Sequence, residues 1–218
     1  MASQLNQINQ PEACNDSSGK LTRKDLMIIL HDLVYILGAV AVIFMFFFRV
    51  VTVEGDSMNP TLCNRDRVIM LSGIWYDDPA AGDIVVARIP SFSAEPLIKR
   101  IIAVEGDTVD IDYAAGNVLV NGESLQEAYI PEPTFRDFEE AGLTFPQEIG
   151  EGCVFLLGDN RNMSYDSRFY LIGQVDRRNI LGKVVFLAFP GRSAASGRME
   201  YSRIGMIEQE VRDGTGNE

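Results

Sequence analysis

The run LMIILHDLVYILGAVAVIFMFFF, residues 26–48, decides how this chain is organised. About 20 consecutive apolar residues are enough to cross a bilayer as a helix. His31 and Asp32 interrupt the run only near its start, where polar side chains reach the membrane interface. A cleaved signal peptide is the alternative, with a shorter apolar core of about 7–15 residues and a small-residue cleavage site. Ala39-Val40-Ala41 has that form, but several phenylalanines follow it, which favours a retained anchor.

The charges around this run predict its orientation. Lys20, Arg23 and Lys24 precede it, whereas only Arg49 lies directly after it. The positive-inside rule therefore places the N-terminus in the cytoplasm and the downstream chain outside. We expect a disordered cytoplasmic tail at 1–25, a transmembrane anchor at 26–48, an extracytoplasmic domain at 49–207 and a polar tail at 208–218.

The composition excludes several classes of protein. The 218 residues are 46% hydrophobic and 23% charged, which is typical of a folded chain. A net charge of −12 without a basic stripe excludes a nucleic-acid binder. The only histidine, His31, lies in the apolar run, so a downstream catalytic site needs another base and cannot be a His-rich metal site. Cys14, Cys63 and Cys153 are too few for a disulfide framework, although Cys63 and Cys153 could pair.

The chain after the anchor is predicted to be mostly β. Short runs rich in valine and isoleucine alternate with Gly-Asp, Asn-Gly, Asp-Pro and Pro-Gly turns, and Asn121-Gly122 is a hairpin signal. We expect no helix there, and residues 110–152 form a looser, cap-like insertion. The predicted strands are Val50–Val53, Arg67–Leu71, Asp83–Ile89, Leu97–Val104, Thr108–Asp112, Val118–Val120, Val154–Leu157 and Gly182–Phe189.

Lys99 is the candidate base. The two-residue period of a strand places it on one face with Leu97, Ile101 and Ala103, and its neighbour Arg100 on the other. An ammonium on an apolar face is desolvated, which lowers its pKa from about 10.4 toward 7. The alternative is a lysine whose stem crosses the sheet edge while its amine stays in water.

Ser57 is the candidate nucleophile. It lies about nine residues after Phe48, so an extended chain keeps it within roughly 30 Å of the membrane end. A serine between Gly-Asp and Pro is commonly a turn residue. Beside a neutral lysine, the same hydroxyl becomes a plausible nucleophile.

A third segment, GDNRNMSYDSR at 158–168, is dense in short polar and charged side chains. Taken in order, the three segments resemble bacterial type I signal peptidases, in the Gram-positive-like form with a single anchor. The likeness covers about residues 30–207 and is least clear across 110–152. The matching boxes are Ser57–Leu62 (SMxPTL), Lys99-Arg100 with Gly106-Asp107, and Gly158–Arg168, supported by Ala81–Val86 and Asn179–Lys183.

The resemblance implies a role for each residue of these boxes. Ser57 would be the nucleophile, Lys99 the general base, and Ser164 the group that orients the amine by a hydrogen bond. Some members have a serine at the position of Gly55 that helps to hold the oxyanion, so here the backbone N–H of Ser57 would be the main donor. Salt-bridged scaffolding would come from Asp159, Asp166, Arg100 and Arg168, and shallow pockets for small side chains from Met58, Leu62, Leu97 and Ile98.

The resemblance also implies the fold and the partners. We expect an antiparallel β-sheet catalytic domain of signal-peptidase type that needs no metal or cofactor. It would cleave signal peptides from exported preproteins, delivered by the export machinery, after a small-x-small motif. The partners would be these preproteins and the lipid bilayer, with no nucleic acid. Trp75 and Tyr76 would belong either to a membrane-facing rim or to ordinary loops and core.

Two other functions stay open. One is a related Ser-Lys protease that cleaves itself, as in SOS-type repressors, although residues 1–25 are too short and polar for a DNA-binding head. The other is a non-catalytic, membrane-anchored β binding module.

Overall fold

The computed structural model describes residues 22–193 and 196–207, in two compact units, Met1–Val42 and Ile43–Glu218. The described part of the first unit, residues 22–42, is almost entirely helix α1 (Arg23–Phe47). The last turn of this helix belongs to the second unit. It starts just before the predicted apolar run, where Asp25 accepts a hydrogen bond from the Thr22 backbone N–H at 3.0 Å in the manner of a capping box. Among the described residues, α1 is the one helix long and apolar enough to cross a membrane. The tails at 1–21 and 208–218 lie outside the described residues.

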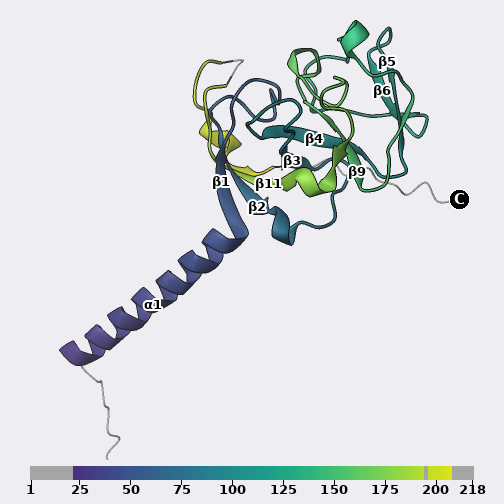
Figure 1. Ribbon diagram of the computed structural model, residues 1–218. Helices are drawn as coiled ribbons and strands as arrows, with labels where there is room; N and C mark the ends of the chain where they lie inside the picture. Colours follow the sequence, from purple (N-terminus) through teal and green to yellow (C-terminus); the bar gives the residue numbers. More distant parts are fainter. Residues whose placement is uncertain (1–21, 194–195, 208–218) are drawn as a thin grey trace, which may run out of the picture. The chain divides into compact units, whose positions relative to one another are not determined.

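The second unit is built on an antiparallel sheet of eight strands (Figure 1). Their order is β1-β2-β11-β3-β4-β9-β10, and β12 pairs with β11. The strands are β1 (Phe48–Thr52), β2 (Arg67–Ser72), β3 (Ile84–Ala87), β4 (Leu97–Val104), β9 (Cys153–Leu157), β10 (Val175–Asp176), β11 (Ile180–Phe189) and β12 (Gly205–Met206).

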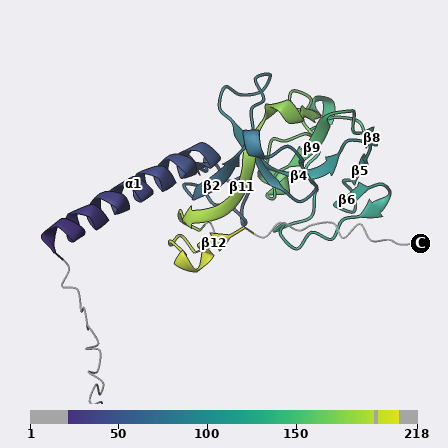
Figure 2. The same ribbon diagram turned by 90° about the horizontal axis from the view of Figure 1, so that it is seen from below.

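A smaller antiparallel sheet, in the order β7-β6-β5-β8, comes from the chain between β4 and β9. Figure 2 shows β5, β6 and β8 together on one side of β4 and β9. The predicted Asn121-Gly122 hairpin is confirmed, because both residues have positive φ (55° and 80°) between β6 and β7. The strands are β5 (Thr108–Asp112), β6 (Asn117–Val120), β7 (Glu123–Ser124) and β8 (Gln147–Glu148).

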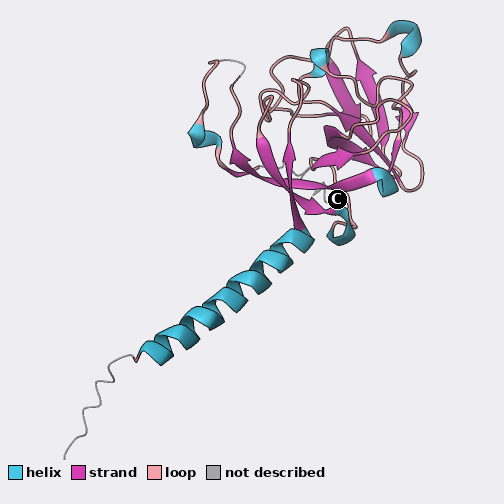
Figure 3. Ribbon diagram, turned by 60° about the vertical axis from the view of Figure 1, so that its left-hand side comes forward, coloured by secondary structure: helices cyan, strands magenta, loops and turns pink. Residues whose placement is uncertain are grey.

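The prediction of a mostly β, antiparallel fold is therefore confirmed, and Figure 3 shows strands and loops throughout the second unit. All eight predicted strands form, with ends shifted by a few residues at most. Within 110–152, strands of the small sheet occupy parts of 110–124 and 147–148, and residues 125–146 carry no strand. The remaining regular elements are short 3₁₀ turns at Gly73–Trp75, Glu139–Ala141, Arg161–Met163, Arg177–Asn179 and Tyr201–Arg203.

Strand β4 contributes to three apolar clusters. Ile98 packs against the first, Leu97 and Ile101 join the second, and Ile102 and Ala103 join the third, with the small sheet. The expectation that Ala103 shares a face with Leu97 and Ile101 is wrong. A β-bulge between Ile101 and Ala103 adds a residue to β4 opposite β9 and resets the alternation.

The structure bears on two alternatives that the sequence left open. Cys63 and Cys153 are free thiols, so they do not pair. Tyr76 is a structural residue, because its hydroxyl donates to Asp83 at 2.6 Å. Trp75 is 46% exposed and stacks on Phe47 with ring centroids 4.5 Å apart, as suits an apolar rim.

Candidate active site

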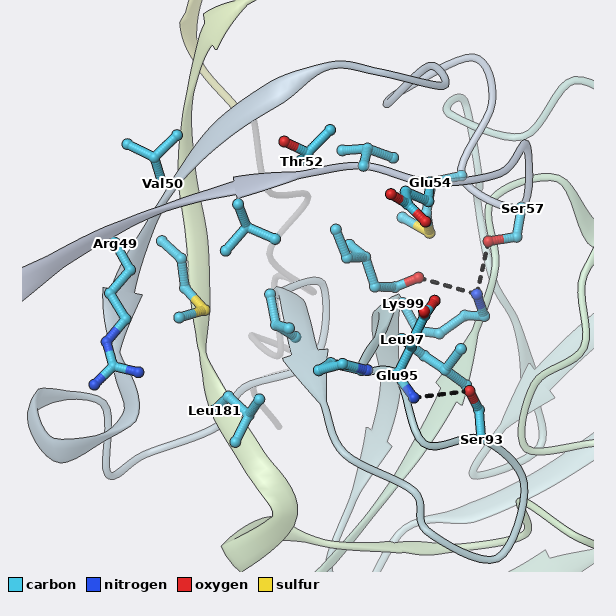
Figure 4. Close-up of a pocket in the computed structure, with 17 residues that line it drawn as sticks. Arg49, Val50, Thr52, Glu54, Ser57, Ser93, Glu95, Leu97, Lys99 and Leu181 are labelled. Atoms are coloured by element: carbon cyan, nitrogen blue, oxygen red, sulfur yellow. Dashed lines mark hydrogen bonds between the residues drawn. The ribbon is translucent and has the colours of Figure 1, made fainter.

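Ser57 and Lys99 meet although 42 residues separate them. Lys99 lies on β4 opposite Val85 of β3, and its side chain is covered so that the residue is only 3% exposed. Ser57 follows β1 in a turn, and its Oγ accepts a hydrogen bond from Lys99 Nζ at 2.7 Å (Figure 4). The same Nζ donates to the Ile98 carbonyl oxygen at 3.0 Å.

Burial also changes the acidity of this amine. Desolvation lowers the pKa of Lys99 from 10.5 to about 8, against the opposing attraction of the carboxylates of Asp166 and Asp159. A pKa near 8 leaves a useful fraction of the amine neutral around neutral pH. The amine can therefore accept a proton from the hydroxyl that it contacts.

The turn that carries Ser57 is held by the segment after β9. Asn160 donates from its backbone N–H to the Ser57 carbonyl, and from its side-chain amide to the Asp56 carbonyl, both at 3.0 Å. Thr61 Oγ1 donates to Asp159 Oδ2 at 2.5 Å. Both Asn160 and Thr61 stand in the quoted boxes, but nothing in the sequence pattern singled them out as links between two distant segments.

The four charged residues predicted as scaffolding form two buried ion pairs. Arg100 donates from Nε and Nη2 to the two oxygens of Asp159 at 2.8 and 2.7 Å. Arg168 makes the same fork to Asp166, at 2.8 and 2.9 Å. Burial alone would raise the pKa of Asp166, but the Arg168 charge, the Arg168 hydrogen bonds and the Gly158 N–H together outweigh it, so this pKa is lowered. Both carboxylates are buried and fully paired with arginines, which favours a scaffolding role over proton transfer.

Ser164 is fully buried, as the predicted orienting residue should be. Its Oγ has no hydrogen-bond partner among the described residues, and the Lys99 amine bonds to Ser57 and Ile98 instead. The orienting bond is thus not formed in this structure, and the role of Ser164 stays a prediction.

Gly158 sits where Ser57 and Ser164 come together. A Cβ added at Gly158 would lie 2.5 Å from the Ser57 carbonyl oxygen and closer still to Ser164 Oγ. Only glycine allows this approach of backbone to backbone. Gly158→Ala is therefore expected to displace Ser57 and lower the cleavage rate by roughly 100-fold or more. Gly205→Ala on β12, where the added Cβ meets open space and φ is not positive, serves as the control. Equal rates for the two variants would contradict this account.

An open cleft of about 450 Å³ leads to the pair. Its lining includes three of the four predicted pocket residues, Met58, Leu97 and Ile98. Leu62 does not line it; this side chain is fully buried in the first apolar cluster instead. Sequence reasoning missed the other apolar lining residues, which include Met70, Val86 and Leu181, and the charged ones, Arg49, Glu54 and Glu95. These residues come from separate strands and loops, so no local pattern could have grouped them.

Residues of the insertion also contact the charged scaffold around the Ser57–Lys99 pair. Glu127 forms a buried ion pair with both terminal nitrogens of Arg161, whose Nε donates to the Gly158 carbonyl at 3.1 Å. The Arg100 guanidinium lies 3.9 Å from the centre of the Tyr129 ring. The insertion therefore closes over the charged scaffold rather than standing apart from the site.

A serine hydroxyl bonded to a buried, weakly basic lysine in a cleft of a β domain defines a serine-type hydrolase. Comparison with known proteins gives the family: its description is "Signal peptidase, peptidase S26", and its profile matches residues 26–189. The chain belongs to this signal peptidase family and is a membrane-anchored hydrolase of the serine protease type. This confirms the resemblance to bacterial type I signal peptidases.

Individual relatives agree. A signal peptidase I of Leptolyngbya laminosa is 37% identical over 63% of this chain and 67% of its own length. A probable thylakoidal processing peptidase 2 of Arabidopsis thaliana is 36% identical over 64% of this chain but only 37% of its own length. A Bacillus licheniformis signal peptidase I is 32% identical over 66% and 78%. A crystal structure of an Enterococcus faecalis signal peptidase I, 30% identical, covers 49% of this chain and 97% of that one with a TM-score of 0.41.

Proposed function

We propose that this protein is a membrane-anchored endopeptidase that removes N-terminal signal peptides from exported preproteins after a small-x-small motif. Ser57 is the nucleophile and Lys99 the general base. The observation that carries this assignment is the 2.7 Å bond between Ser57 Oγ and a buried amine whose pKa is lowered to about 8.

The reaction follows from the positions of these two groups. Neutral Lys99 accepts the Ser57 proton while Oγ attacks the scissile carbonyl carbon, and the resulting ammonium returns the proton to the leaving amine. A water molecule, deprotonated by the same amine, then hydrolyses the acyl-enzyme. The backbone N–H of Ser57 makes no hydrogen bond within the described residues and is a donor for the developing oxyanion.

The cleft suits an extended peptide. Strand β4 pairs with β3 from Leu97 onward, but β9 joins its other edge only at Arg100. Among the described strands, none pairs with this edge at Leu97 and Ile98, and a peptide can add there as a further strand. Apolar, buried Met58, Met70 and Val86 lie on the floor beside this edge and leave shallow space for small side chains.

The anchor suits a substrate that is itself in the membrane. By the positive-inside rule, Arg23 and Lys24 at the start of α1 place the N-terminus in the cytoplasm and the β domain outside. A signal peptide delivered by the export machinery leaves its apolar part in the same bilayer. Tethering both to one surface raises their effective concentration.

Cleavage of a synthetic preprotein tests this function. The purified full chain in detergent is expected to cut it once, after the small-x-small motif, as read by mass spectrometry of the products. Since only neutral Lys99 accepts the proton, kcat/KM should rise about tenfold per pH unit up to about pH 8 and then level off. A flat profile between about pH 6 and 9 would contradict Lys99 as the base. A peptide bound but left intact at every pH would favour the non-catalytic binding module.

A further inference from the structure

We propose that Glu54 and Glu95 make the cleft select preproteins with a lysine or arginine at the middle position of the small-x-small motif. This inference rests on the proposed function and names a substrate preference of the same cleft. It concerns the one motif position that the requirement for small side chains leaves free.

The two carboxylates stand on opposite walls of the cleft at its catalytic end. Figure 4 shows Glu54 beside Ser57 on one wall and Glu95 on the other, with both side chains projecting toward the space between the walls. Glu54 comes shortly after β1, directly behind the buried Val53. Glu95 lies just before β4, and both glutamates are exposed.

Neither carboxylate has a partner among the residues that the structure describes. The described residues contain seven ion pairs, and none of them includes Glu54 or Glu95. No hydrogen bond within 22–193 and 196–207 reaches either side-chain carboxylate; Glu95 is bonded only through its backbone N–H, to Ser93. Of the other acidic residues around the site, Asp159 and Asp166 are fully buried and paired with arginines. Asp56, next to Ser57, accepts a hydrogen bond from the Asn59 side-chain amide at 3.1 Å. These two glutamates are therefore free to attract a cation that enters the cleft.

The remaining charges in the cleft do not cancel this attraction. Its ionisable lining residues are Arg49, Glu54, Glu95 and Lys99. Arg49 lies at the far end of the cleft in Figure 4. Lys99 is uncharged in the form that accepts the Ser57 proton. While Lys99 is neutral, the charged cleft residues nearest Ser57 are thus the two glutamates. Arg65 and Arg67 share a neighbouring pocket with Glu54, but neither forms an ion pair with it among the described residues.

The strand geometry places the middle residue at these charges. Side chains of an extended peptide alternate between the two faces of the strand. When the two small residues of the motif face the apolar floor near Met58 and Val86, the residue between them faces the mouth of the cleft. The exposed glutamates of the two walls lie at that mouth, so a long cationic side chain there reaches them while its aliphatic stem stays over the wall.

The test compares peptides that differ only at this middle position, with lysine, alanine or glutamate. The full-length protein in detergent is expected to cleave the lysine peptide about tenfold faster than the glutamate peptide at low ionic strength, since each exposed pair contributes a few-fold. The preference should shrink as salt rises from about 0.02 M to about 0.5 M. In Glu54→Gln/Glu95→Gln, the ratio of the two rates should fall to about one. The ratio on a single enzyme cancels any change in Lys99 basicity.

Glu123→Gln is the matched control, because it removes one exposed carboxylate from β7 in the small sheet. It should keep the wild-type ratio. Two results would overturn the charge preference and leave the proposed function standing. One is equal rates for the lysine and glutamate peptides on the wild-type protein. The other is a lysine preference that survives in Glu54→Gln/Glu95→Gln. Cleavage of none of the three peptides would instead contradict the proposed function.

Discussion

Lys99→Met is expected to abolish cleavage while making the folded protein more stable. Methionine fills a similar volume but cannot accept the Ser57 proton, so kcat/KM should fall by about 1,000-fold or more. Lys99 as a residue is only 3% exposed, and the pKa of its amine in the folded state is about 8 against an ordinary value of 10.5. Below about pH 8 the folded protein therefore carries a buried ammonium that the unfolded chain would keep in water.

The sign of the pH effect follows from proton binding. Between about pH 8 and 10.5 the unfolded chain binds more protons at this site than the folded protein, so stability rises with pH across that window. Below about pH 8, burial of the Lys99 ammonium lowers the free energy of unfolding by about 3 kcal/mol. Lys99→Met removes this penalty but also loses the hydrogen bond to Ser57, which costs roughly 1 kcal/mol. Lys99→Met should thus gain about 2 kcal/mol near pH 7, and much less above pH 10.

Denaturant unfolding at pH 7 and at about pH 10.5, with cleavage assays on the same samples, measures both effects. Ser57→Ala is the matched control: it should lose cleavage as completely but keep the buried amine and its pH-dependent penalty. Near-normal turnover in Lys99→Met would refute the proposed pair. A Lys99→Met protein that is inactive and also less stable than wild type at pH 7 would show that the amine is not desolvated.

Arg100→Met is expected to be the most destabilising single change in the charged scaffold. Arg100 and Asp159 are 1% and 0% exposed, and their fork of two hydrogen bonds is closed off from water. Removing the arginine leaves the Asp159 carboxylate buried without its counter-charge, which costs roughly 3–5 kcal/mol. Cleavage should fall as well, because Asp159 also holds Thr61 in the turn of the nucleophile.

The chain supplies a matched control for this variant. Arg178 forms a similar pair with Asp176, but its side chain is 86% exposed. Arg178→Met should leave both the free energy of unfolding and cleavage almost unaltered, since exposed pairs contribute little. Similar losses of stability in the two variants, measured by denaturant titration, would contradict the view that burial makes the Arg100–Asp159 pair important.

Local signals in the sequence were sufficient for the elements of the fold. The apolar run predicted α1 because the number of residues needed to span a bilayer is fixed by helix rise. Alternation and turn residues predicted the strands, since side-chain period and positive φ are properties of a few neighbouring residues, as at Asn121-Gly122. The single histidine, placed in that run, already directed attention to Lys99 as the base.

What the sequence could not give is the meeting of distant residues. Burial of both faces of β4, the bulge before Ala103 and the core position of Leu62 depend on neighbouring strands. The same is true of the cleft, in which Glu54 and Glu95 come from walls far apart along the chain.

The sequence by itself therefore determined that this chain has an apolar anchor, a β domain and a serine and a lysine in recognisable surroundings. Tertiary structure decided that these two side chains touch at 2.7 Å and that water is kept from the amine. The physical reason is that helix length and strand alternation are encoded over a few residues. Desolvation and contact geometry arise only when segments dozens of residues apart pack against one another.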